Sequence, residues 1–218
     1  MIHSDLLLDY GAIRKKFAKH QVIFQEGQPA FYFFQIEEGM VKMVNFGDTR
    51  DYVQGIFIAG ESFGEPPLFW DMPYPAAAIA VTDVSLLALP QKHFMSLLRN
   101  HFDAHLELTR VMCHRLAYKS LLLQKINLED PEGRLLAVID LLKQKLPREK
   151  YEQNGYFTLP LTRQDLADLT GLRVETVIRK IGQLEEKGEI TIHERKFAGA
   201  TSLRVRHIVQ SYTQYLLF

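Results

Sequence analysis

The sequence predicts an α+β protein in which an N-terminal antiparallel β-roll is followed by a long dimerisation helix and a C-terminal winged helix-turn-helix. Three observations support this prediction: short β-prone runs separated by glycines, one long stretch without glycine or proline, and two helices joined at a glycine. The expected division is 1–102 for the roll, 103–128 for the dimerisation helix and 129–218 for the winged helix-turn-helix.

The β-roll is predicted from about residue 20 to residue 100. Six of the 13 glycines lie in this region, at positions 27, 39, 47, 55, 60 and 64. Among them stand the β-prone runs QVIF, FYFFQI, MVKMVNF, YVQGIFI, AAIAV and VSLLAL. Short strands with glycine turns at regular intervals are typical of an antiparallel barrel or roll.

A long helix is predicted over 103–127, which contains no glycine or proline and many strong helix formers. A helix of this length measures about 37 Å at 1.5 Å per residue. Because that exceeds what a small roll can cover, we expect one face to pair with a second copy; a core-packing helix is the alternative. Lys119 interrupts the stripe and argues against a strict coiled coil. The expected seam follows a period near 3.5 residues: Leu108, Met112, Leu116, Leu122, Leu123 and Ile126.

A helix-turn-helix is predicted after the break at Glu129-Asp130-Pro131 and one further helix ending before Pro147. Thr162 and Asp165 have the spacing of a helix N-cap, in which the hydroxyl accepts from a free amide and the acid sits near the positive helix end. Gly171 permits the left-handed backbone that ends a helix. The next helix buries its apolar residues at i, i+4 and i+7: Val177, Ile181 and Leu184. Two helices of about 8 and 13 residues around a short glycine turn match the motif.

The opposite face of that second helix carries an unusual row at i, i+3, i+4 and i+7: Glu175, Ile178, Arg179 and Gly182. In a DNA major groove, arginine binds guanine O6 and N7, glutamate accepts from cytosine N4, and an aliphatic side chain contacts the thymine methyl. The mixture favours a face that reads base pairs; a solvated face with one stray isoleucine is the alternative. The runs ITIH and TSLRVR predict the wing. Contacts to DNA phosphates are expected from polar and basic residues: Thr162, Arg163, Arg173, Thr176, Lys180, Arg195, Lys196, Arg204 and Arg206.

The amino-acid composition neither indicates nor excludes DNA as a binding partner. The 26 Lys and Arg balance the 26 Asp and Glu, and from Pro160 onward nine basic residues face seven acidic ones, a net of +2. The sequence contains no apolar run of about 18 residues that could span a membrane, and its first residues lead us to expect no secretory signal. With one cysteine, Cys113, no disulfide framework forms within the chain, so we expect a reducing cytoplasm.

The segment LTRQDLADLTGLRVETVIRKIGQLEEKGEI closely resembles the helix-turn-helix of the Crp/Fnr family of bacterial transcription regulators. VIFQEGQPAFYFFQIEEGMVKMV, GESFGEPPLFW and TDVSLLALPQKHFMSLL resemble that family's cyclic-nucleotide-binding-like roll, so the resemblance covers nearly the whole chain. It implies a homodimer that binds double-stranded DNA at a two-fold symmetric site and acts on RNA polymerase.

The resemblance also implies roles for single residues. In the family, the residues matching Glu175 and Arg179 read a T-G-containing half-site, and those matching Val174 and Ile178 vary with specificity. Arg173 departs from the usual Ser or Thr N-cap, at a cost of roughly 1 kcal/mol; a phosphate contact is its alternative role.

The expected effector pocket comprises Gly64, Glu65, Pro75, Ala76 and Ser120. In members that bind cyclic nucleotides, an arginine-serine pair follows FGE and holds the phosphate. Here Phe63-Gly64-Glu65 is kept, but Pro75-Ala76 replaces that pair, and Pro66 and Pro67 lack backbone N–H groups. Burying a phosphate without a guanidinium is costly, so cyclic AMP is not the expected effector. An unknown apolar ligand, or no ligand, remains open.

No cofactor, metal or enzymatic activity is predicted. Four cysteines hold an iron–sulfur cluster, and this chain has one. His101 and His105 have a chelating spacing but no evident third ligand, so we expect solvated helix histidines. No nucleophile–base motif or phosphate-binding glycine loop is present. The alternative to a DNA-binding regulator is a ligand-binding module whose winged helix docks on protein.

Overall fold

The computed structural model describes residues 1–218 apart from 49, 129, 189, 198–199 and 207–218, and without the side chains of 121–122, 124–128, 191–197, 200–204 and 206. The chain forms two compact units, Met1–Ala117 and Tyr118–Phe218. The boundary between the two units, after Ala117, falls within the long helix, which the sequence predicted as a separate segment at 103–128. The three-part division therefore stays a prediction.

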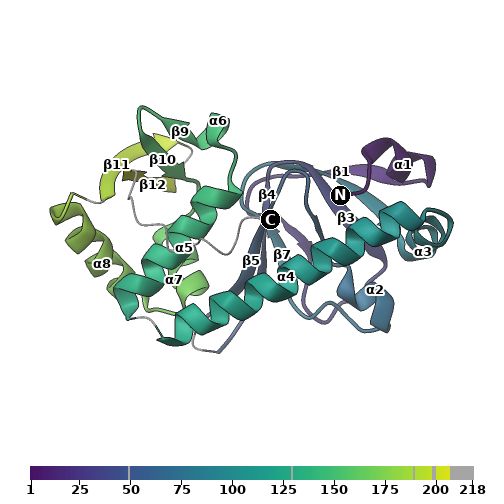
Figure 1. The fold of residues 1–218 in the computed structure, drawn as a ribbon, viewed down its shortest axis with the longest axis horizontal. Helices are drawn as coiled ribbons and strands as arrows, with labels where there is room; N and C mark the ends of the chain where they lie inside the picture. Colours follow the sequence, from purple (N-terminus) through teal and green to yellow (C-terminus); the bar gives the residue numbers. More distant parts are fainter. Residues whose placement is uncertain (49, 129, 189, 198–199, 207–218) are drawn as a thin grey trace. The chain divides into compact units, whose positions relative to one another are not determined.

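The first unit is the predicted β-roll, built from two four-stranded antiparallel sheets (Figure 1). One sheet has the order β1 (Ile13–Phe17), β8 (Val84–Pro90), β3 (Tyr32–Glu38), β6 (Ser62–Phe63). The other has the order β2 (Val22–Phe24), β7 (Ala77–Ala80), β4 (Met40–Asn45), β5 (Tyr52–Ile58). All six β-prone runs of the sequence form strands, so the prediction of an N-terminal antiparallel sheet structure is confirmed.

Strand alternation sends side chains into two separate cores. Phe34 and Ile36 of β3 point between the sheets, where they meet residues of the other sheet such as Val41 and Ala78. Phe33 lies on the opposite side of β3, in a second core. Because successive side chains of a strand point to opposite faces, β3 and β8 are apolar on both faces and read as continuous hydrophobic runs.

Helices cover the outer face of the β1-β8-β3-β6 sheet. They are α1 (Ser4–Asp9), α2 (Pro66–Trp70), α3 (Gln91–Asn100) and the start of α4 (Phe102–Leu128) (Figure 1). The second core contains Leu7 of α1, Phe94 of α3 and Leu108 of α4. The predicted long helix is thus confirmed, one residue longer at each end than the sequence indicated.

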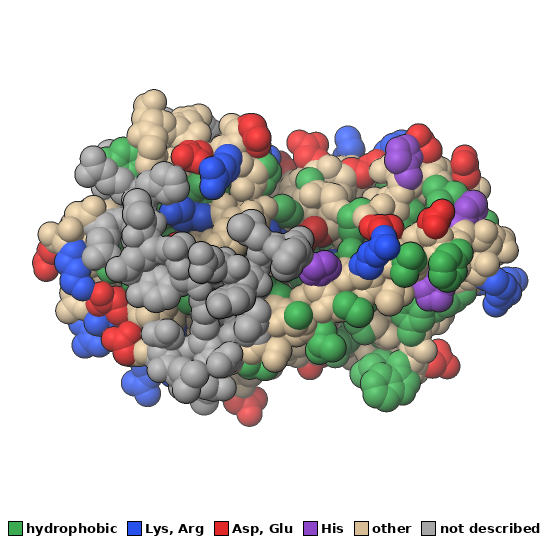
Figure 2. All heavy atoms as spheres, viewed as in Figure 1, with side chains coloured by type: hydrophobic (Ala, Val, Ile, Leu, Met, Phe, Trp, Pro, Cys, Tyr) green, Lys and Arg blue, Asp and Glu red, His purple; other side chains and the backbone are tan. Residues whose placement is uncertain are grey.

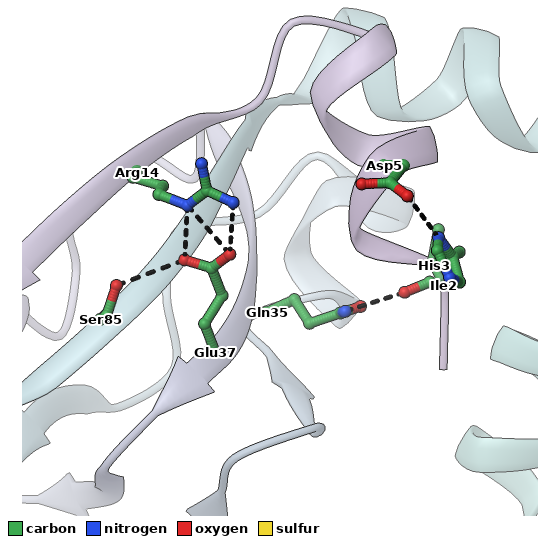
Figure 3. A network of polar contacts seen from close by, with 7 residues as sticks. All are labelled: Ile2, His3, Asp5, Arg14, Gln35, Glu37 and Ser85. Carbon is green, nitrogen blue, oxygen red and sulfur yellow. Dashed lines mark hydrogen bonds and ion pairs between the residues drawn. The ribbon is translucent and has the colours of Figure 1, made fainter.

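Strand β1 was not predicted, because its sequence IRKKF is rich in charge. It is an edge strand, and charged residues are common on edges, where they discourage pairing with other chains. Arg14 fastens it to β3 through an ion pair with Glu37, with 3.0 Å between Nη2 and Oε1, and the Ser85 hydroxyl donates to the same carboxylate (Figure 3). Beside it, the buried Gln35 amide donates to the carbonyl of Ile2 over 2.8 Å (Figure 3).

The second unit contains the predicted helix-turn-helix and wing. Helix α5 (Pro131–Lys145) is capped by Asp130, which accepts from the Gly133 amide over 2.8 Å. A short helix α6 (Arg148–Tyr151) follows α5. The unit has one four-stranded sheet, in which the strands lie in the order β11 (Ile190–Phe197), β12 (Ala200–Arg206), β10 (Tyr156–Leu159), β9 (Glu152–Gln153). The unit also contains helices α7 (Arg163–Thr170) and α8 (Val174–Glu186). Strands β11 and β12 form the predicted wing hairpin.

Candidate nucleic-acid interface

Helix α7 begins with the predicted cap, and the structure shows it in reciprocal form. The Thr162 hydroxyl accepts from the Asp165 amide over 3.0 Å, and the Asp165 carboxylate accepts from the Thr162 amide over 2.9 Å. Asp165 also accepts from the Thr162 hydroxyl over 2.7 Å. This capping box satisfies two backbone donors at the helix end and fixes where α7 starts. The Thr162 hydroxyl is engaged in the cap, so its predicted phosphate contact stays a prediction.

The turn between the helices is set by Gly171, whose φ of +68° lies in the left-handed region. Its amide bonds to the carbonyl of Ala167, which closes α7. Helix α8 then begins after Arg173, whose side chain makes no capping hydrogen bond. The departure from the usual Ser or Thr cap is therefore visible in the structure, and the Arg173 guanidinium is exposed rather than used within the helix.

Helix α8 has the two faces that the sequence predicted. Its buried face is formed by side chains with no exposed surface: Val177, Ile181 and Leu184. Glu175 and Arg179 are exposed, and Ile178 exposes 47% of its surface. An aliphatic side chain thus lies exposed between two charged residues on this face. Val174 and Thr176 are half-buried at the start of the same helix.

Lys180 is held by an ion pair that the sequence did not reveal. Its Nζ lies 3.1 Å from Oε2 of Glu132 on α5, and Lys187 Nζ lies 2.6 Å from the other oxygen of that carboxylate. Hydrogen bonds from Lys187 and Lys180 hold the pKa of Glu132 below its usual value. The pair joins α5 to α8, so Lys180 must be shared between Glu132 and any phosphate. Lys180 and Glu132 are 48 residues apart, so no local pattern in the sequence predicts this ion pair.

The remaining predicted phosphate contacts are placed only in part. Arg163 is half-buried at the first position of α7. The backbones of Arg195 and Lys196 lie in β11, and those of Arg204 and Arg206 in β12, while their side chains lie outside the described residues.

Three of the five predicted effector-pocket residues are buried in the roll: Gly64, Glu65 and Ala76. Gly64 is buried with a φ of +78°, and a Cβ there would lie 3.3 Å from the Tyr74 ring. Ala76 is fully buried in the core between the sheets. Burial raises the pKa of Tyr74 to about 12, and its ring stacks on Phe24 with 3.7 Å between centroids. Aromatic rings thus fill the space beside Gly64.

Glu65 has a partner that sequence reasoning missed. Arg115 of α4 donates to the Glu65 carboxylate over 3.1 Å, and the Ser62 hydroxyl donates to the same oxygen. Arg115 also donates to the Ser62 carbonyl over 2.6 Å and lies 5.1 Å from the Phe57 ring centroid. Its position seven residues after the buried Leu108 returns Arg115 to the same helix face, but that spacing does not indicate which residue is its partner.

The other two predicted pocket residues are exposed. Pro75 is exposed, and its carbonyl accepts from Asn45 over 2.6 Å. Ser120 is exposed on α4 within the second compact unit, so its position relative to Glu65 is not determined.

The four described residues of the predicted α4 seam fall into two groups. Leu108 is buried in the roll's own core, with Met112 packed against it, so Leu108 is corrected from seam to core. Leu116 and Leu123 expose 74% and 54% of their surfaces. The side chains of Leu122 and Ile126 lie outside the described residues. Figure 2 shows hydrophobic side chains at the surface over α2 and along α4.

Two domain families match the chain, and together they account for both units. Residues 14–101 match the cyclic nucleotide-binding domain, and residues 133–198 match the Crp-like helix-turn-helix domain. The chain belongs to the Crp/Fnr family. As a member of this family it is a DNA-binding transcription regulator and not an enzyme. Its N-terminal domain is of the class that binds effectors in this family.

Curated relatives agree with this assignment, and a solved structure shares the fold. The anaerobic regulatory protein of Pasteurella multocida is 26% identical over 187 residues, which cover 82% of this chain and 65% of that protein, less than two thirds of its length. A CRP-like cAMP-activated global transcriptional regulator of Mycobacterium tuberculosis is 25% identical over 87% of this chain and 84% of its own. The structure of FixK2 from Bradyrhizobium japonicum shares the fold, with a TM-score of 0.74 at 22% identity over 90% of this chain and 93% of that one.

The described residues contain no group of three or more His, Cys, Asp or Glu that could hold a metal ion. Among the described helices, none is long and apolar enough to cross a membrane.

Proposed function

We propose that this Crp/Fnr regulator binds, as a homodimer, to a palindromic DNA site whose bases are read by α8. The observation that carries the proposal is the exposed row of Glu175, Ile178 and Arg179 on a helix whose opposite face is fully buried. A helix fixed on one side by the core presents the other side at a constant angle, which base reading requires.

Each residue of the row suits one feature of a base pair. Arg179 would bind guanine through O6 and N7, and Glu175 would accept from cytosine N4. Val174 and Ile178 would contact thymine methyl groups. Together these contacts would select a half-site that contains T-G. Arg163, Arg173 and the wing residues Arg195 and Lys196 would hold the phosphates, which gives affinity without sequence information.

The homodimer would form along α4. Leu116 and Leu123 are large aliphatic side chains, exposed at i and i+7 on one face of the helix. Hydrophobic residues at this spacing meet those of a second helix in a coiled-coil-like seam. A two-fold symmetric pair of α8 helices would then meet half-sites about 34–36 Å apart, one turn of DNA. Bound in this way in the cytoplasm, the dimer would recruit or block RNA polymerase.

The roll is proposed to work without cyclic AMP. Pro75 and Ala76 stand where family members that bind cyclic nucleotides have the arginine and serine for the phosphate. The Glu65 carboxylate already accepts hydrogen bonds from Arg115 and Ser62, and the Tyr74 ring lies against Gly64. An effector, if one is used, would therefore be of another class.

A random-duplex selection tests the proposed function. The purified full chain is presented with random duplexes at physiological salt and without added ligand. We expect recovery of a palindrome with T-G half-sites. Recovery of an asymmetric motif would contradict the homodimer, and recovery of no motif, both with the purified protein and in cell extract, would contradict sequence-specific binding.

A further inference from the structure

Gly182 occupies a place in α8 where the fold does not need a glycine. It stands in the ninth position of a 13-residue helix, between Ile181 and Gln183. Gly171 and Gly188, which follow the two helices of the motif, have φ of +68° and +73° and need the freedom of glycine. Gly182 has an ordinary helical backbone. A Cβ added there would meet no heavy atom within 4 Å beyond the local helix backbone.

A glycine in a helix interior is unfavourable, because it loses more backbone entropy on folding than any other residue. Alanine would fit the space and favour the helix. Nothing in the packing of the described residues therefore accounts for the glycine, and we look for its cause outside that packing.

The position of Gly182 indicates where that cause lies. It follows Ile178 by four residues and Arg179 by three, so at 100° per residue it lies in line with the exposed row of α8, and it is itself half-buried. The next position of the row is Glu186, an exposed acid that phosphates would repel. Gly182 is thus the last position of the row before its negatively charged end, on the third turn of the helix.

We infer that Gly182 is a positioning residue: it is a notch in α8 through which the sugar–phosphate wall of the major groove approaches the helix backbone. The inference rests on the proposed DNA-reading role of α8. An α-helix with its side chains is about 10–12 Å across, and the major groove is about 12 Å wide. The first turns of a recognition helix meet the base edges, so a later turn passes the wall of the groove. A missing side chain there lets the first turns reach the bases.

Two substitutions of Gly182 test the inference, with a neighbour as control. Gly182→Ala adds one methyl group and Gly182→Gln adds a longer, helix-favouring side chain. Gln183→Ala changes an exposed neutral residue about 100° round the same turn. For each chain, thermal unfolding, affinity for the duplex recovered by the wild type, and the bases selected from random duplexes are measured.

We expect Gly182→Ala to unfold a few degrees higher than the wild type, because alanine favours the helix. The same variant should bind the preferred duplex at least tenfold more weakly, and Gly182→Gln more weakly still, while both select unchanged bases. Gln183→Ala should bind within about twofold of the wild type. A stabilised protein that binds more weakly cannot be explained by damage to the fold.

Other results would overturn the inference. If Gly182→Ala binds within twofold of the wild type, or loses no more affinity than Gln183→Ala, the notch does not exist. If Gly182→Ala selects different bases, the residue acts in base reading and not in positioning. A wild type that selects no motif would remove the proposed function and this inference together, whereas a wild type that selects a palindrome leaves the variants to decide the inference alone.

Discussion

Arg115 and Glu65 join the long helix to the β-roll through an ion pair, with 3.1 Å between Nη1 and Oε1. The Glu65 side chain is 2% exposed and that of Arg115 is 22% exposed. A carboxylate so deeply buried is tolerated because it is paired and accepts a second hydrogen bond from Ser62. The pair fixes the part of α4 that ends at Ala117 against the strand that precedes Glu65.

Removing the guanidinium should therefore destabilise the roll. We expect Arg115→Met to lower the free energy of unfolding by about 3 kcal/mol, since it leaves an unpaired charge in an apolar site. Denaturant unfolding measures the loss. Arg110→Met is the matched control on the same helix. Because both side chains of the Arg110–Glu107 pair are exposed, this substitution should cost far less stability than Arg115→Met.

The double variant Arg115→Met/Glu65→Gln completes this test. With the charge also removed, the Ser62 hydrogen bond can persist, and much of the lost stability should return. Equal costs for Arg115→Met and Arg110→Met would contradict the view that Glu65 is buried and dependent on Arg115.

Arg179→Ala should weaken binding to the preferred duplex by about 1–3 kcal/mol and relax selection at one base pair. The physical reason is the loss of two parallel hydrogen bonds to one guanine. Competition binding against duplexes substituted at each position measures both effects. Arg148→Ala, an exposed arginine of the same unit outside α8, should leave base selection unchanged. Selection that is unaltered in Arg179→Ala would refute its base-reading role.

Leu116→Glu should convert the dimer to monomers, because a charge would enter the proposed seam. Leu116 is 74% exposed in the protomer, so the fold itself should tolerate the change. Ala117→Glu places the same charge on the adjacent exposed position and serves as the control. Sedimentation gives the oligomeric state, and the monomers should bind the palindrome poorly. A Leu116→Glu chain that remains dimeric would place the interface elsewhere.

Local signals predicted most of the fold, and long-range contacts account for what was missed. The capping box at Thr162, the turn at Gly171 and the buried face of α8 all depend on residues within a few positions of each other. The edge strand β1 was missed because its residues are charged. Leu108 and Leu116 look alike in sequence, yet one packs in the protomer's own core and the other is exposed. Helical periodicity alone does not tell an internal partner from an external one.

The ion pairs of Glu65 and Glu132 were invisible for a related reason. Each joins residues about 50 positions apart, 65 with 115 and 132 with 180. A single sequence carries no signal that connects such positions. The surroundings of the candidate base-reading residues could therefore be predicted from sequence, whereas the residues that fix α4 and α8 in place could not.

Cyclic AMP at millimolar concentration should leave the unfolding temperature unchanged. A ligand that binds the folded state raises its stability in proportion to the logarithm of concentration over Kd, so a bound nucleotide would be detected. Thermal unfolding with and without the nucleotide makes the measurement, and the selected duplex serves as a positive control for ligand-induced stabilisation. A clear rise with cyclic AMP would show that the roll can hold a phosphate without the arginine-serine pair.

Glu132→Gln should have opposite effects on stability and on DNA binding. The folded-state pKa of Glu132 is lowered by Lys187 and Lys180, so its ionised form stabilises the fold above about pH 4.5, the ordinary value. That contribution is lost as the pH falls through the depressed folded-state pKa. The variant should therefore be less stable than the wild type at pH 7, by less than about 1 kcal/mol because the site is partly exposed, and the difference should vanish in acid. Denaturant unfolding at the two pH values measures it.

Freed from Glu132, Lys180 can neutralise a phosphate without first breaking an ion pair. Binding to the preferred duplex should become tighter, and the dependence of affinity on salt should become steeper by about one ion. Glu152→Gln removes a carboxylate from a weaker pair of the same unit and controls for the general gain in positive charge. If both variants tighten binding equally, net charge alone is responsible, and Lys180 has no specific place against the DNA.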